Sequence, residues 1–163
     1  MSNAKVVSTP LANHFKISID HCPKTNEEEK YMSKVPYASA VGCVMCFRVC
    51  TRPDLAHAIS QVCKCMSKSR KQHWEVVKWI FQYFKGTTSL GIMFDRQQSK
   101  PSVIGYVDSD NAWDFDDRRS TTRFVFTLAG GPIMWRSSVQ YVVAMSTTEA
   151  DYMAAGEASK EAL

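Results

Sequence analysis

Hydrophobic positions in the first half of the chain recur at helical spacing. The segment Tyr37–Val49 is apolar around most of its circumference, which predicts a helix that is covered on more than one side. After a break that contains a proline, the apolar positions form one stripe at steps of four, three and four residues: Leu55, Ile59, Val62 and Met66. That spacing predicts a second helix with one buried face.

A third helix is predicted from about Gln72 to Lys85, with Gly86 at the position of a C-terminal stop. Its apolar stripe consists of Trp74, Val77, Phe81 and Phe84. Three lysines repeat at seven-residue steps on another face of the same segment: Lys71, Lys78 and Lys85. Residues 1–35 look loosely organised, and the polar run Pro23–Lys30 within them predicts a loop.

From residue 90 onward the pattern changes to short apolar runs between turn residues. These runs predict strands at Leu90–Phe94, Ser102–Asp108, Arg123–Leu128, Pro132–Arg136 and Tyr141–Met145. Ser146–Ala162 is helical in composition, and Ser146 with Glu149 has the spacing of a capping box. The sequence therefore predicts an α+β fold, with helices, an antiparallel meander and a final helix. Because that helix has no stop signal before Leu163, we expect a truncated piece.

The composition is that of a folding chain, with 45% hydrophobic and 22% charged residues. No stretch approaches the roughly 18 uncharged apolar residues that cross a bilayer, and residues 1–13 lack the apolar core of a signal peptide. We therefore expect an intracellular protein, in cytoplasm or nucleus, that is not secreted and has no membrane partner.

Charge is distributed unevenly along the chain. Residues 51–100 carry nine Lys or Arg against three Asp or Glu, whereas residues 101–163 carry five against nine. This order suggests a part that contacts phosphates next to a part that binds cations. Two solvated faces of opposite sign would give the same distribution, and charge alone favours that simpler interpretation.

Three of the six cysteines, Cys43, Cys46 and Cys50, fall on one face of a predicted helix. A Cys-x-x-Cys pair is typical of zinc or redox sites. No second pair completes a set of four ligands, however, and the neighbouring residues are apolar. We therefore expect these thiols to pack as small hydrophobic side chains.

The densest polar feature is a run of aspartates: Asp108, Asp110, Asp114, Asp116 and Asp117. Its spacing does not fit a calcium-binding loop, which requires Gly at the sixth position, where this chain has Trp. Asp108 ends an apolar strand, and Glu149 opens a helix. Carboxylates in such positions can converge on divalent cations in sites that cleave phosphodiesters. A turn residue and a helix cap are the alternative interpretation.

Several phrases, in order along the chain, resemble the Pol polyprotein of copia-type LTR retrotransposons. They include Val7–Ala12, Cys50–Ala56, Gly105–Asp110 and Ser146–Tyr152. The resemblance covers essentially the whole chain. It implies that residues 1–95 correspond to a thumb- or connection-like segment at the end of reverse transcriptase, whose helices rest on the template–primer duplex. Residues 96–163 would be the truncated first half of an RNase H-like fold, a three-stranded antiparallel meander plus the first helix.

The resemblance also implies an activity, the degradation of the RNA strand of RNA–DNA hybrids with Mg²⁺ or Mn²⁺. Asp108 and Glu149 would be catalytic metal ligands, and Lys71, Lys78 and Lys85 would contact nucleic acid. The implied partners are an RNA–DNA hybrid or another nucleic-acid duplex, and the rest of the Pol polyprotein.

This sequence departs from the family pattern. It lacks the third and fourth metal-binding carboxylates and the aspartates of the polymerase. Trp113 and Arg123 stand where the family usually has Gly. We therefore expect a catalytically impaired fragment, with a non-catalytic nucleic-acid-binding or structural remnant as the alternative.

Overall fold

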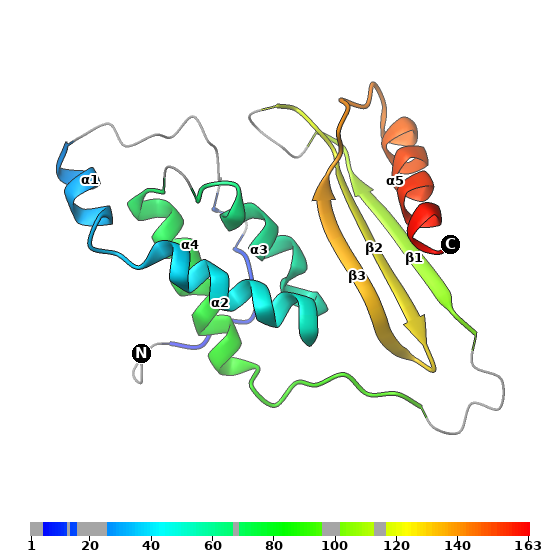
Figure 1. The fold of residues 1–163 in the computed structure, drawn as a ribbon, viewed down its shortest axis with the longest axis horizontal. Coiled ribbons are helices and arrows are strands. Elements are labelled where there is room, and N and C mark those ends of the chain that lie inside the picture. The colour runs from blue at the N-terminus through cyan, green and yellow to red at the C-terminus, as the bar shows by residue number, and fades with distance from the viewer. Residues whose placement is uncertain (1–4, 13, 16–25, 67–68, 96–101, 113–116) are drawn as a thin grey trace. The chain divides into compact units, whose positions relative to one another are not determined.

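The computed structural model describes residues 5–12, 14–15, 26–66, 69–95, 102–112 and 117–163. The chain divides into two compact units, Met1–Leu90 and Gly91–Leu163. The described elements of the first unit are helical, and the second unit contains three strands followed by a helix (Figure 1). The α+β class predicted from the sequence is therefore confirmed.

The first unit is built from α-helices and one short 3-10 turn. Its elements are α1 (Asn26–Met32), α2 (Tyr37–Cys50), the 3-10 turn η1 (Pro53–Leu55), α3 (Ala56–Cys63) and α4 (Lys71–Gly86). The fully buried side chains of its core include Val41, Leu55, Ile59, Val77 and Ile80. Each such side chain contributes roughly 1.5–3 kcal/mol when it is removed from water, so this core is the main source of the unit's stability.

Helix α1 forms where the sequence predicted a loop. Glu27, Glu28 and Glu29 occupy its first turn, where negative charge favours the positive end of the helix dipole. The Glu28 carboxylate also accepts a hydrogen bond from the backbone N–H of Lys71, at 3.3 Å. The loop prediction is thus wrong from Asn26 onward, and residues 23–25 lie outside the described part of the chain.

Helices α2 and α4 have the predicted bounds to within a residue, but the buried face of α4 is shifted. Its buried residues are His73, Val76, Val77, Ile80 and Tyr83, whereas Trp74, Phe81 and Phe84 are only partly buried. When a helix has apolar residues over a broad part of its surface, the sequence does not fix which of them are buried most deeply. Packing against the other helices decides that. Met66 is 43% exposed because α3 ends at Cys63, so the predicted helical stripe is wrong at that position.

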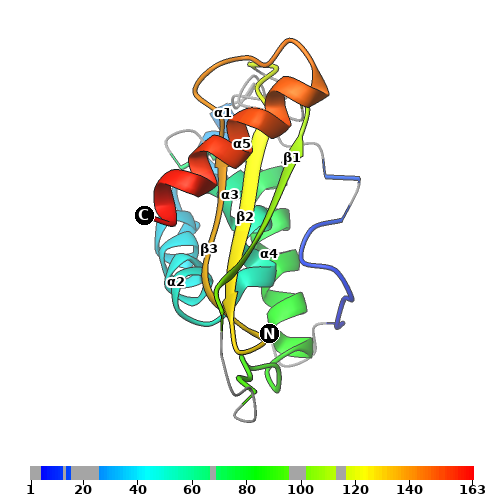
Figure 2. The same ribbon diagram turned by 90° about the vertical axis from the view of Figure 1, so that its right-hand side faces the viewer.

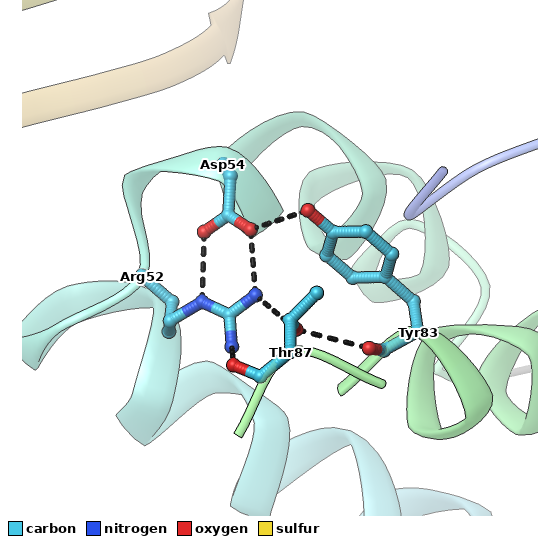
Figure 3. A network of polar contacts seen from close by, with 4 residues as sticks. All are labelled: Arg52, Asp54, Tyr83 and Thr87. Carbon is cyan, nitrogen blue, oxygen red and sulfur yellow. Dashed lines mark hydrogen bonds and ion pairs between the residues drawn. The ribbon is translucent and has the colours of Figure 1, made fainter. Parts of the chain in front are cut away.

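A buried arginine joins the break after α2 to the end of α4 (Figure 3). Arg52 is 4% exposed, and its Nε and Nη2 donate to the two carboxylate oxygens of Asp54 at 2.9 and 2.6 Å. Its guanidinium also donates to the carbonyl and the hydroxyl oxygen of Thr87, at 3.2 and 2.7 Å. The Tyr83 hydroxyl donates to Asp54 at 2.8 Å, so four residues form one network.

The network holds both partners of the ion pair in their charged forms. Burial by itself raises the pKa of Asp54, but the hydrogen bonds from Arg52 and Tyr83 outweigh it and hold that pKa below its usual 3.8. The hydrogen bond with Asp54 raises the pKa of Arg52. Burial, together with the hydrogen bond to Asp54, raises the pKa of Tyr83.

The second unit is a three-stranded antiparallel sheet with one helix on one face. Its elements are β1 (Ile104–Asp110), β2 (Thr121–Leu128), β3 (Gly131–Val139) and α5 (Thr147–Glu161), and the strand order is β1-β2-β3. Figure 2 shows α5 crossing the sheet, and its contacts are with β1 and β2. Phe124 and Phe126 of β2 pack with Ala158 of α5 in a small core.

Alternation along the strands decides which side chains meet α5. Phe124 and Phe126 face the helix, and the Ser109 hydroxyl donates to Asp151 of α5. Because successive residues of a strand point to opposite faces, and directly paired residues share a face, Asp108, Asp110 and Arg123 project from the opposite face of the sheet.

Two predicted strands are absent, and both segments are used as connections. Leu90–Phe94 has no strand pairing, and its last residues, Met93 and Phe94, lie against Gly131 of the β2–β3 hairpin instead. A Cβ on Gly131 would stand 2.5 Å from the Phe94 ring, so only glycine admits this approach. Tyr141–Met145 is also not a strand, and it connects β3 to α5. Just before it, the side-chain amide of the buried Gln140 donates to the carbonyl of Ala150 at 2.9 Å.

In the described part of the chain, β1 pairs with β2 alone and its other edge carries exposed apolar residues. Ile104, Tyr106 and Val107 are 47%, 60% and 42% exposed. An exposed apolar edge strand favours association with other chains.

Replacement of Arg52 by alanine should destabilise the first unit by about 2–4 kcal/mol, because Asp54 would keep a partly buried charge without its partner. Urea unfolding followed by far-UV circular dichroism measures the change. Lys34→Ala removes an exposed cation from the same unit and should stay within about 0.5 kcal/mol of the parent chain. Equal midpoints for the two variants would contradict the role assigned to Arg52.

Candidate functional site

The aspartates of β1 lie beside an arginine on the neighbouring strand. The β1–β2 register places Asp108 directly opposite Arg123. The Nη2 atom of Arg123 is 2.9 Å from the Oδ2 atom of Asp108, and the same nitrogen also pairs with Oδ2 of Asp110. The side chains of Asp108, Asp110 and Arg123 are 67%, 36% and 32% exposed, so the cluster is open to solvent on one side.

The carboxylate of Glu149 is engaged at the start of α5. Its Oε2 atom accepts a hydrogen bond from the backbone N–H of Met145 at 2.7 Å. The backbone N–H of Glu149 donates to the Ser146 hydroxyl at 3.1 Å, which confirms the Ser146 half of the predicted capping box. The reciprocal bond reaches Met145, one residue before the cap. In the described part of the chain, Asp108 and Glu149 thus each have a local partner of their own.

Asp151 is the acidic residue of α5 that contacts β1, and the sequence reasoning missed it. Its carboxylate accepts from the hydroxyl of Ser109, the neighbour of Asp108. A signal was present, because Ala150, Ala154 and Ala158 form the buried stripe of α5. At 100° per residue, Asp151 lies about 60° from the middle of that stripe and Glu149 about 140° from it.

The arrangement does not fit the magnesium site that the family resemblance implies. A divalent cation needs several oxygen ligands that converge on one point. Among the residues that the structure describes, no three His, Cys, Asp or Glu side chains gather in this way. Asp108 is paired with a cation of the protein, and Glu149 caps a helix. Asp114, Asp116 and the altered position Trp113 lie outside the described residues.

The three lysines of α4 lie on the side of the helix opposite its buried residues. Lys71 and Lys85 are exposed. Lys78 donates to the Glu75 carboxylate at 2.6 Å, which offsets part of its charge. The Nζ atom of Lys71 lies 5.9 Å from the centre of the Tyr31 ring. The three lysines thus lie on one side of α4, as their seven-residue spacing predicted.

The cysteines of α2 do not pack as predicted. Cys43, Cys46 and Cys50 are exposed, because α2 buries only its other side through residues such as Val41 and Val44. The expectation of buried thiols is wrong for these three. Of the remaining cysteines, Cys65 is buried, burial raises the pKa of the Cys63 thiol, and Cys22 lies outside the described residues.

A groove of about 620 Å³ lies between the end of β3 and α5. Tyr141 and Tyr152 line it and are more than 80% exposed. Its charged residues are balanced, and Arg136 is ion-paired to Glu161 at 2.7 Å. Asp108 is not among its lining residues, so the groove is separate from the acidic strand end.

Comparison with known proteins finds retrotransposon Pol polyproteins that match nearly the whole chain. No protein-family model and no solved structure matches it. The retrovirus-related Pol polyprotein from transposon TNT 1-94 of Nicotiana tabacum is 52% identical over 161 residues, which cover 99% of this chain and 12% of that protein. The Pol polyprotein from transposon RE2 of Arabidopsis thaliana is 32% identical over 99% of this chain and 10% of its own length.

A relative of similar size carries a different name. The secreted RxLR effector protein 161 of Plasmopara viticola is 42% identical over 132 residues, which cover 81% of this chain and 92% of the effector. In the part of the chain that the structure describes, no helix has the length and apolar character to cross a membrane.

Replacement of Glu149 by alanine should lower the stability of the second unit by about 1 kcal/mol, because the start of α5 would lose its capping carboxylate. Glu149→Gln keeps an acceptor for the Met145 N–H and should stay close to the parent chain. Thermal unfolding with and without 10 mM Mg²⁺ measures both variants. A loss in Glu149→Ala that appears only with Mg²⁺ would contradict the capping role and indicate a metal ligand.

Proposed function

This chain belongs to the family of copia-type retrotransposon Pol polyproteins, and we propose that it is the segment where reverse transcriptase passes into RNase H. The chain covers 12% and 10% of the two polyproteins compared above, so it corresponds to a short stretch of them. In this proposal, the first unit is the thumb- or connection-like end of the polymerase. The second unit is the beginning of an RNase H-like fold.

The order of elements supports this assignment. A helical unit precedes an antiparallel meander whose first strand carries Asp108 and whose last strand is followed by α5. The motifs that resemble the family imply the same order, with a segment of reverse transcriptase before a segment of RNase H. The proposed substrate class is an RNA–DNA hybrid, of which the family degrades the RNA strand.

The chain by itself is proposed to have little or no nuclease activity. One observation carries this conclusion, namely that Arg123 engages Asp108 where a metal-dependent nuclease needs that carboxylate for its cation. Loss of one positioned charged group in a catalytic site typically costs about 10²–10³ in rate.

The second candidate function is duplex binding without cleavage. It is favoured by the α4 face that carries Lys71, Lys78 and Lys85 away from the buried side of the helix. Such a face can neutralise phosphates of either strand without reading sequence. An intracellular setting belongs to the same proposal, and the secreted effector among the relatives is the finding that argues against it.

Incubation of the chain with an end-labelled RNA–DNA hybrid in Mg²⁺ or Mn²⁺ should give no cleavage above that of Asp108→Asn or Glu149→Ala. The reason is that Asp108 is ion-paired with Arg123 and that the described residues contain no group of three potential metal ligands. Denaturing gels measure the products, and circular dichroism shows that each protein is folded. Cleavage by the parent chain that vanishes in Asp108→Asn would overturn the proposal of an inactive segment.

Binding of the same hybrid should weaken steeply with salt if the α4 face contacts phosphates. The triple variant Lys71→Gln, Lys78→Gln and Lys85→Gln should reduce the slope of log K against log salt by about 2–3, since each lost phosphate contact contributes about 0.9. Replacement of three lysines outside α4, Lys5→Gln, Lys34→Gln and Lys160→Gln, removes the same charge as a control. Equal slopes in the two triple variants would rule out the α4 face as the contact.

A further inference from the structure

We infer that Arg123 occupies, with its own guanidinium, the position that a divalent cation would need between Asp108 and Asp110. The strand end is then a partly neutralised cluster in which a side chain of the protein stands where the metal would. Such a replacement would cause the inactivity proposed above. Its link to nuclease activity rests on that proposal, whereas the metal-binding tests below do not.

The geometry identifies the position. Asp108 and Asp110 are two residues apart on β1, so both carboxylates project from the same face of the sheet. A single atom, Nη2 of Arg123, pairs with Oδ2 of both. A Mg²⁺ ion shared by these two oxygens would need to stand about 2.0–2.1 Å from each, which is the space that this NH₂ group fills.

The fold holds the guanidinium in place. The β1–β2 register sets Arg123 opposite Asp108, so sheet pairing delivers its side chain to the carboxylates. The Nε atom of Arg123 is buried and has no hydrogen-bond partner, which leaves the two carboxylates to compensate the charge. A tethered cation competes with a free one at the effective concentration of its tether, which reaches millimolar values or more for short connections.

The charges act in the same direction. Two carboxylates alone carry a charge of −2, and Arg123 reduces that of the cluster to −1. Mg²⁺ gives up its water reluctantly and binds weakly to one or two carboxylates even without a competing cation. Removal of the guanidinium should therefore create affinity for a divalent cation where the parent chain has little.

The test is a titration of the full chain with Mn²⁺, which broadens the NMR signals of nearby amides. Arg123→Gln should bind Mn²⁺ at least about tenfold more tightly than the parent chain, because the repelling charge is gone. The broadened amides should be those of residues 108–110. The double variant Arg123→Gln with Asp108→Asn should lose this gain.

Arg123→Lys is the matched control, since it keeps the positive charge and should stay close to the parent chain in Mn²⁺ affinity. A gain in Arg123→Lys as large as that in Arg123→Gln would overturn the inference. Equal Mn²⁺ affinity of the parent chain and Arg123→Gln at these residues would overturn it as well. Both readouts measure metal binding, so they remain informative whether or not any variant cleaves a hybrid.

A second measurement uses the unaltered protein, in case the variants do not fold. The guanidinium of Arg123 should show slow rotation about its Cζ–Nη bonds in NMR spectra, as a group held by two carboxylates does. Addition of millimolar Mn²⁺, or of Mg²⁺ to avoid broadening, should leave that rotation slow. Release of the guanidinium to fast rotation by Mg²⁺ would show that the metal displaces it, and would overturn the inference.

Discussion

The ion pair between Arg52 and Asp54 is the interaction on which the first unit depends. The backbone turns sharply between α2 and α3, and such a turn leaves carbonyl groups without helical partners. The end of α4 leaves carbonyl groups in the same way, and the guanidinium of Arg52 reaches across from this turn to donate to the carbonyl and the hydroxyl oxygen of Thr87, just after α4. One buried charge therefore fixes where two helices end relative to each other, and the apolar core closes around that arrangement.

The sequence predicts elements well where local patterns and packing agree. Helices α2 and α4 and the β2–β3 hairpin follow from apolar spacing and turn residues alone. Prediction failed where a contact distant in sequence decides the structure. Helix α1 is polar, yet Glu28 contacts α4. Leu90–Phe94 has the apolar character of a strand, but its last residue, Phe94, packs against Gly131 of a hairpin instead.

The candidate site shows the same division. The strand that carries Asp108 and the cap at Ser146 could be predicted, because each depends on neighbours in sequence, although β1 continues to Asp110, two residues beyond the predicted end. The partner of Asp108 could not, since Arg123 reaches it only through the register of two strands. The choice between Glu149 and Asp151 depends on which side of α5 faces the sheet. The alanine stripe marks the side of α5 that is buried, but the sequence alone does not show that the sheet is what covers it.

The close approach of Phe94 to Gly131 has a consequence for where the chain can be divided. The backbone N–H of Asp95 also donates to the carbonyl of Ala129, so residues 93–95 are held by the β2–β3 hairpin. A protease that cut at residue 96 would separate residues 93–95 from the chain of the hairpin, and Gly131 would lose the cover of Phe94. A cut before Gly91 would keep residues 93–95 attached to the second unit. The position of a cut within the few residues after α4 therefore decides whether the released second unit keeps all of its contacts.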